Sequence, residues 1–158
     1  MEKKLKRSGV FDPRASIRRA EHTQLSREIN SGQYAGLNRI DRIRAGVPYY
    51  AIEEVSKRMN VPVKNILNKL GLPQTTYNKK KRENALLNGR DSEIILYLDE
   101  LFDFGLQVFN GEHEKFHRWM QKANISLGGV SPHSLLDSIT GIQEVKNCLN
   151  KLEYGNFS

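Results

Sequence analysis

The chain has 158 residues, 38% of them apolar, which is enough for one ordinary domain or two small ones with a buried core. Its formal net charge of +7 is unevenly distributed. Residues 1–90 hold twenty Lys and Arg against eight Asp and Glu, a balance of +12, whereas residues 91–158 have a balance of −5. The basic front half favours binding to a polyanion such as nucleic acid, although uneven solvated faces would have the same composition.

Composition also excludes several classes of protein. The longest apolar run, residues 94–98, is far too short to span a bilayer. The basic start, residues 1–7, has no apolar stretch behind it and so does not resemble a signal peptide. We therefore expect a cytoplasmic protein with no membrane partner. A single cysteine, Cys148, excludes an internal disulfide, and its place on an apolar helix face predicts a packed thiol.

Residues 1–36 form a basic arm in which no hydrophobic period persists. The cations at Lys3, Lys4, Lys6 and Arg7 and the pair Arg18-Arg19 could follow a phosphate backbone. A flexible tail with a short helix between Ser16 and Glu28 is an equally good interpretation.

Residues 37–90 have the pattern of a helix-turn-helix domain. Apolar spacing predicts a helix over residues 37–44 and two more beyond Pro48, which are separated where Val61-Pro62 breaks the helical conformation. The second of these two runs from Pro62 to Leu70 and ends at Gly71. After a three-residue turn, another helix is predicted from Gln74 to Arg82, which completes the motif.

The last of these helices reads QTTYNKKKR, with hydroxyl, amide and aromatic groups first and four cations behind them. In a helix-turn-helix protein the N-terminal end of this helix touches base edges and the cations reach phosphates. Lysine runs at helix ends are also commonly just solvated, in bundles with no role in DNA binding. The candidate DNA-binding residues are Gln74, Thr75, Thr76, Tyr77, Asn78, Lys79, Lys80, Lys81 and Arg82.

Residues 91–111 predict a central buried helix. Asp91 or Ser92 can cap it, and apolar side chains from Ile94 to Phe109 lie all round it, so it must be covered on more than one side. It is either the hub of a monomer or the seam of a homodimer.

The segment from His113 to His117 matches H-E-x-x-H, the pattern of zinc hydrolases in which Glu114 would be the general base. No third ligand follows at the metzincin spacing, because Met120 stands where glycine is required. We expect a solvated amphipathic helix, no metal and no cofactor. Because no other catalytic set is visible, we also expect that the chain is not an enzyme.

The segment from Asn124 to Ser158 predicts two helix starts. Ser131-Pro132 offers a hydroxyl cap with proline at the first helical position, and Thr140 with Gln143 has the form of a capping box. Gly155 is expected in the left-handed position that closes the second helix. The apolar face of that helix would consist of Ile142, Val145, Cys148, Leu149 and Leu152.

This last segment resembles the toxin-binding domain of the Xre/MbcA/ParS antitoxins. The residues that carry the resemblance are Asn124, Leu127-Gly128-Gly129, Ser131-Pro132, Leu135-Leu136, Thr140-Gly141, Glu144-Val145, Leu149 and the ending Leu152 to Gly155. The front half is similar to the Xre-type DNA-binding part of the same family at Gly46 to Pro48 and Gly71 to Tyr77. It departs at Asn78-Lys79-Lys80, where the family often has arginines, and residues 1–30 are not covered.

The resemblance implies an all-α protein, an Xre-like helix-turn-helix bundle followed by a small helical toxin-binding domain at 112–158. It also implies the antitoxin of a type II toxin-antitoxin pair, which neutralises an NAD-consuming RES-like toxin and represses its own operon by binding operator DNA, expected as a homodimer. We expect the C-terminus to cover the toxin's active site, with its aromatic ring and carboxylate in place of a nucleotide base and phosphate. The candidate toxin-binding residues are Leu152, Glu153, Tyr154, Gly155, Asn156, Phe157 and Ser158. The alternative is a stand-alone helix-turn-helix repressor with a C-terminal dimerisation domain.

Overall fold

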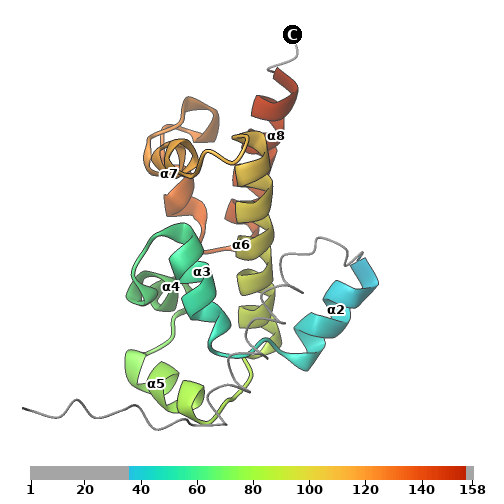
Figure 1. Cartoon of the computed structure of the whole chain (residues 1–158), viewed down its shortest axis with the longest axis vertical. Helices are drawn as coiled ribbons and strands as arrows, with labels where there is room; N and C mark the ends of the chain where they lie inside the picture. Colours follow the sequence, from blue (N-terminus) through green and yellow to red (C-terminus); the bar gives the residue numbers. More distant parts are fainter. Residues whose placement is uncertain (1–35, 156–158) are drawn as a thin grey trace, which may run out of the picture. The chain divides into compact units, whose positions relative to one another are not determined.

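The computed structural model describes residues 36–155, with side chains from residue 39 (Figure 1). These residues contain no β-strand, only two isolated bridges, so the predicted all-α class is confirmed. The predicted arm up to residue 35, with its helix between Ser16 and Glu28, and the tail Asn156 to Ser158 lie outside the described residues. The elements are α2 (Gly36–Ala45), α3 (Ala51–Met59), α4 (Val63–Leu70), α5 (Gln74–Arg82), α6 (Gly89–Val108), α7 (His113–Gln121), η1 (Ile125–Leu127), η2 (Pro132–Leu135) and α8 (Ile139–Gly155).

The central helix α6 is the element against which α2, α3, α7 and α8 pack (Figure 1). As predicted, its apolar residues are buried around most of its circumference, among them Ile95, Leu98 and Leu101. The predicted cap is wrong, however, because the helix starts earlier. The Asn88 side chain accepts from the Asp91 backbone N–H at 2.9 Å and donates to the Asp91 carboxylate at 2.8 Å, a reciprocal cap of the helix start.

Ser92, the other expected cap, lies inside α6 and has a different role. It is fully buried, and its hydroxyl accepts from the Val47 backbone N–H at 2.9 Å and lies 3.3 Å from the Leu87 carbonyl. These bonds tie the first turn of α6 to the loop before α3 and to the segment that follows α5. Two buried backbone groups at this junction are thereby satisfied.

The helix-turn-helix elements agree with the sequence prediction to within one residue. The helix α4 ends at Gly71, whose φ of 70° is the left-handed conformation in which glycine is favoured. The helix α5 follows after Leu72 and Pro73 and spans the predicted residues. Buried Ile66, Leu67 and Leu70 hold α4 in the core that it shares with α3 and α6.

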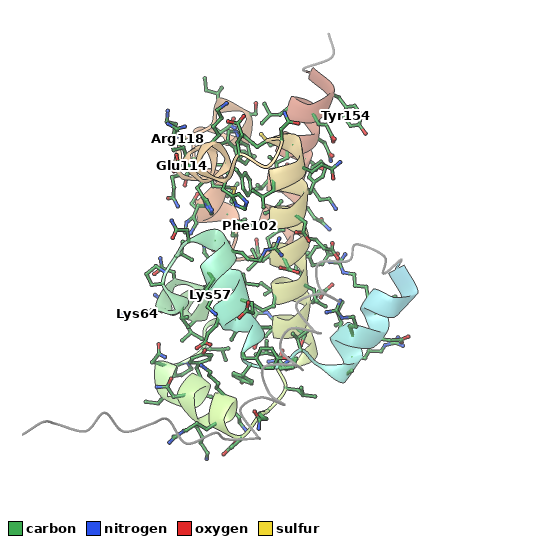
Figure 2. The ribbon with its side chains drawn as sticks, in the orientation of Figure 1. Lys57, Lys64, Phe102, Glu114, Arg118 and Tyr154 are labelled. Carbon is green, nitrogen blue, oxygen red and sulfur yellow. The ribbon has the colours of Figure 1, made fainter. Side chains whose placement is uncertain are left out.

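In the C-terminal part, α7 packs on α6 through aromatic rings. Phe116 is fully buried and meets Phe102 edge-on, with 5.1 Å between the ring centroids. A side chain at Gly105 of α6 would overlap the Phe116 ring, so the glycine permits this close approach. In Figure 2, Phe102 lies on α6 below the turn of α7 that carries Glu114 and Arg118.

The helix α8 packs against α6 through the predicted apolar face, which is confirmed. Its predicted start is wrong: the Ser138 hydroxyl, not that of Thr140, accepts from the Gly141 backbone N–H, at 3.1 Å. A Cβ at Gly141 would overlap the Leu135 carbonyl oxygen, so the chain turns into α8 where only glycine fits. Thr140 is already the second residue of the helix and is exposed.

Two further expectations about helix ends are corrected. Gly155 does not take the left-handed conformation, because α8 continues through it. Ser131 makes no side-chain cap although Pro132 is at the first position of η2 as expected. Instead the Ser131 carbonyl accepts from the Ser134 hydroxyl at 2.6 Å, which leaves the Ser131 side chain uninvolved in the turn.

Candidate functional site

The second helix of the helix-turn-helix, α5, is divided into an exposed face and a face that packs on the domain. Only Tyr77 is buried in it. The residues whose side chains are exposed are Gln74, Thr75, Asn78, Lys79 and Arg82. Because these positions follow the helical repeat, they make one continuous face with polar groups toward the N-terminus and cations toward the C-terminus. Thr76, Lys80 and Lys81 are half-buried at its borders.

Tyr77 is 3% exposed, so its ring belongs to the core and cannot reach a base edge. Its hydroxyl donates to the Glu53 carboxylate of α3 at 3.0 Å, and Lys81 forms an ion pair with the same carboxylate. Burial and the neighbouring carboxylate raise the pKa of Tyr77, which therefore remains protonated. The structure thus places two of the nine predicted DNA-binding residues, Tyr77 and Lys81, in the attachment of α5 to α3.

The two cations on the exposed face, Lys79 and Arg82, have no acidic partner among the described residues. Arg82 contacts the Asn78 carbonyl, and the Gln74 amide donates to the Asn78 amide oxygen at 3.1 Å. Lys80, by contrast, pairs with Glu83 at 3.6 Å. The exposed face therefore offers two cations to an anionic partner and two amides whose only side-chain partners are each other.

The H-E-x-x-H segment forms the start of α7, so the two histidines do lie one turn apart. Among residues 39–155, no group of three His, Cys, Asp or Glu side chains comes together in a way that could hold a metal ion. His117 lies against the rings of Phe102 and Phe116, and its pKa is lowered mainly by burial. In this part of the chain the segment forms a packing face with solvated edges.

The end of α8 carries the described part of the predicted toxin-binding residues. Leu152 packs against the core, Glu153 is half-buried, and Tyr154 is 72% exposed. In Figure 2, Tyr154 projects from the last turn of α8 to the side away from α7. The described part of the helix thus ends with a large, mostly exposed aromatic side chain, and residues 156–158 of the prediction lie outside the described residues.

Sequence reasoning missed three side chains that hold these surfaces in place. Glu53 links α3 to α5, and Arg58 of α3 pairs with Asp99 and Asp103 of α6. Lys69 of α4 donates to the His133 carbonyl of η2 at 3.0 Å. Partners as far as 64 positions away leave no periodic signal in the sequence, although acidic residues on the otherwise apolar α6 could have been noted.

The described residues thus form a helix-turn-helix whose helix α5 has a polar and cationic exposed face. The long helix α6 joins it to a helical C-terminal part, in which the last turn of α8 carries the exposed Tyr154. Within the unit formed by residues 34–158, α5 and the end of α8 lie at opposite ends (Figure 1). No described helix is both long and apolar enough to cross a membrane. This architecture defines a class of protein: a helix-turn-helix protein with a separate C-terminal interaction domain.

Comparisons with known proteins give the family. The antitoxin Xre-like helix-turn-helix domain matches residues 39–98, and the Xre/MbcA/ParS antitoxin C-terminal toxin-binding domain matches residues 105–155. The chain therefore belongs to the Xre/MbcA/ParS antitoxins. The boundary between the two matches falls inside α6, which contributes to both domains.

Individual relatives agree with this assignment. An antitoxin Xre of Yersinia enterocolitica is 29% identical over 134 residues, which cover 85% of this chain and 90% of the relative. An antitoxin Xre of Photorhabdus laumondii is 24% identical over 113 residues, 72% of this chain and 76% of the relative. A Prs ADP-ribosylating antitoxin of a Sphingobium species is 29% identical over 130 residues, 77% of this chain and 82% of the relative.

Proposed function

We propose that this chain is the antitoxin of a toxin-antitoxin pair, which binds its toxin through the end of α8 and represses its own operon through α5. The proposal rests on the position of two exposed surfaces, the outer face of α5 and the end of α8, at opposite ends of one unit. One is cationic and polar, and the other ends in an exposed aromatic ring. Because the two surfaces lie at opposite ends of the unit formed by residues 34–158, this unit has separate places for operator DNA and for a toxin.

For DNA binding, the exposed face of α5 enters the major groove, as recognition helices of this motif do. Gln74, Thr75 and Asn78 then lie toward base edges, and Lys79 and Arg82 lie toward phosphates. Thr76 and Lys80 border this face, whereas Tyr77 and Lys81 keep α5 at its angle to α3. In the homodimer that we propose, two copies of α5 would read the two halves of a palindromic operator.

Operator binding is tested with the double variant Lys79→Ala, Arg82→Ala. Each phosphate contact that is lost should lower the slope of log K against log salt by about one. We therefore expect weaker binding to all sequences and a slope smaller by about two, measured by fluorescence anisotropy on the promoter fragment of the operon. Lys146→Ala is the matched control, an exposed cation on α8. An unchanged slope in the double variant would place the DNA contact on another element.

For toxin binding, the end of α8 with Tyr154 and the residues that follow it covers the active site of the toxin. We propose that the aromatic ring of Phe157 occupies the place of a nucleotide base in the toxin's active site. The Sphingobium relative is named for ADP-ribosylation, a reaction that takes ADP-ribose from NAD, and this supports a toxin that consumes NAD. We propose that the toxin of this chain is of the RES-like type and acts, as its antitoxin does, in the cytoplasm.

Neutralisation is tested by co-expressing the toxin of the neighbouring gene with the full chain or with a version that ends at Gly155. We expect growth arrest and NAD depletion only with the shorter version. A chain that lacks residues 1–30 is the matched control and should neutralise normally, because we assign that segment to a basic arm. If the version ending at Gly155 protects cells as well as the full chain, covering by the tail is wrong.

The alternative function is a stand-alone repressor in which the C-terminal domain serves for dimerisation. The two interpretations differ in what the exposed end of α8 contacts. We propose the domain division used above: an arm at 1–36, a DNA-binding domain at 37–90, a central helix at 91–111 and a toxin-binding domain at 112–158. If the C-terminal domain only dimerises, Tyr154→Ala should dissociate the dimer, and the wild-type chain should not bind the protein of the neighbouring gene.

A further inference from the structure

The loop that follows α7 carries an isoleucine with almost no cover. Ile125 is 95% exposed, the largest value among the exposed large hydrophobic residues of the described chain. Val130, across the same loop, is 42% exposed. Large aliphatic side chains are rarely this exposed in a folded protein. Where they are exposed on a polar or charged surface, they mark surfaces that contact a partner.

The loop is ordered by its own hydrogen bonds, so Ile125 is held in place and is not at the tip of a loose segment. The Asn124 backbone N–H donates to the Val130 carbonyl at 2.9 Å, and the Gly129 N–H donates to the Asn124 carbonyl at 2.9 Å. The Asn124 side chain accepts from the Ser126 N–H at 2.9 Å. Gly128 and Gly129 both have positive φ, 73° and 81°, which closes the loop tightly.

Two contacts attach this loop to the C-terminal domain. Leu127 packs against the core, and the Asn124 amide donates to the Cys148 thiol of α8 at 3.5 Å. The turn η1 also contacts α8 directly. Ile125 is therefore presented by the same rigid unit that presents Tyr154.

The sequence segment that contains Ile125 has no charged residue of its own, although Lys122 directly precedes it and Lys151 of α8 acts electrostatically on Cys148 beneath the loop. The fourteen residues from Ala123 to Leu136 contain no Lys, Arg, Asp or Glu, although 27% of the whole chain is charged. The centres of protein interfaces are depleted of charged residues in this way, whereas solvated loops are usually rich in them. The loop consequently has the composition of the centre of a protein contact.

We propose that the loop from Asn124 to Val130 is a second toxin-binding element, with Ile125 inserted into an apolar depression on the toxin. This proposal rests on the proposed toxin binding of the C-terminal domain. The seven residues 152–158 are too few for a stable interface, which takes roughly 20–30 residues and about 800 Å² on each partner. The toxin must therefore cover more of the domain, and the domain that matches residues 105–155 is described as toxin-binding.

The geometry sets a condition on the bound toxin. Tyr154 follows Cys148, the residue beneath the loop, by six positions, which is about 9 Å along α8 and roughly 120° around it. An interface of about 800 Å² is roughly 30 Å across, so it reaches both sites only if the toxin curves around the end of α8. The occupant of the loop is thus a concave surface of the toxin.

The test is the affinity of full-length Ile125→Ser for the toxin of the neighbouring gene, measured by isothermal titration calorimetry with a catalytically inactive toxin. Removal of one buried isoleucine should weaken binding by about tenfold or more. Ile40→Ser is the matched control, because Ile40 is 44% exposed but lies on α2. We expect no more than about a twofold change in the control, and unchanged operator affinity and thermal midpoint in both variants.

The outcomes separate this inference from the proposed function. If Ile125→Ser binds like the wild type while removal of residues 156–158 abolishes binding, the loop is not a contact and the antitoxin function stands. If the wild type itself does not bind the toxin, the proposed function fails. If Ile125→Ser shifts the sedimentation coefficient of the free protein to that of a smaller species, the loop joins two copies of this chain and the inference is overturned.

Discussion

The two halves of the chain are attached to the central helix by different forces. In the front half, α2 and α3 are joined to α6 by ion pairs: Arg39 with Glu100 at 3.0 Å, and Arg58 with both Asp99 and Asp103. In the rear half, no ion pair among the described residues links α7 or α8 to another element. There α8 packs on α6 through apolar side chains.

The difference agrees with the partners that we propose for the two halves. A surface that binds a polyanion needs many cations, and their mutual repulsion is reduced when some of them pair with acidic side chains in the fold, as Lys81 does with Glu53. The rear half presents the exposed side chains of Ile125 and Tyr154, and apolar packing holds it to α6. We therefore expect packing changes to have large effects in the rear half and polar changes to have moderate effects in the front half.

The largest expected effect is that of Gly141→Ala at the start of α8. The added methyl group would overlap the backbone carbonyl of Leu135, which cannot move away as a side chain could. We expect a loss of about 3 kcal/mol in the free energy of unfolding, measured by urea denaturation. Gly155→Ala is the control, since no atom lies within 4 Å of the new Cβ and the glycine has no positive φ. Gly155→Ala should be neutral or should stabilise the protein by a few tenths of a kcal/mol, because alanine has a higher helix propensity than glycine and the effect is small in the last turn of a helix. Equal effects of the two changes would contradict the tight start of α8.

A smaller effect is expected when the polar attachment of α5 is weakened. Tyr77→Phe removes the hydroxyl that donates to Glu53 at 3.0 Å and leaves the buried ring in place. We expect a loss of about 1.5 kcal/mol in stability, because the acceptor is charged. Operator affinity should stay within about threefold of the wild type, because Tyr77 positions α5 and does not contact DNA. A tenfold loss of affinity without a loss of stability would show that the hydroxyl does reach the DNA.

The sequence predicts elements better than it predicts the contacts between them. The bounds of α5 follow from the glycine and proline of the turn before it, and the apolar faces of α6 and α8 follow from local periodicity. Both misplaced helix starts, at Asn88 and at Ser138, arose because another hydroxyl or carboxylate stood within three residues of the true cap. Which of several suitable side chains caps a helix is decided by packing, and the sequence does not show that packing.

The candidate site shows the same limit. The nine residues predicted on α5 could not be divided into contacting and supporting residues from the sequence, because that division depends on Glu53 of another helix. The exposure of Ile125 could not be foreseen either, since isoleucine is usually buried and nothing in the residues around it indicates that the loop turns it outward.

The ion pairs of the front half also predict a dependence of stability on pH. Burial raises the pKa of Asp99 from its ordinary value of 3.8 to about 6, although Arg58 beside it acts in the opposite direction. Because the pKa is raised in the folded state, the contribution of Asp99 is fully present below about pH 4 and is lost as the pH rises through 6. Between pH 5 and pH 7 this amounts to about 1 kcal/mol.

Asp99→Asn isolates this contribution. The stability of the variant at pH 5 relative to pH 7 should be about 1 kcal/mol less favourable than that of the wild type, because the variant has no proton to gain. His117 and His133, whose pKa values are lowered, titrate with the opposite sign but are present in both proteins, so they cancel in the comparison. The same difference between pH 5 and pH 7 in the two proteins would mean that the carboxylate titrates normally.

The smallest expected effect concerns the contact between the two halves. Lys69 of α4 donates to the His133 carbonyl, and among residues 39–155 no other side-chain hydrogen bond joins the helix-turn-helix to the part that follows α6. The Lys69 ammonium is about half-buried, and burial lowers its pKa. Because the group is still partly in contact with water, water can replace part of the bond when it is lost. Lys69→Met should therefore cost only about 0.5 kcal/mol, with Lys64→Met on the same helix as an exposed control that changes nothing. Operator affinity with and without the proposed toxin should be measured for both proteins. If the halves communicate through this bond, any effect of the toxin on operator affinity in the wild type should be lost in the Lys69→Met variant. A variant that keeps the wild-type difference would show that α6 alone connects the two functions.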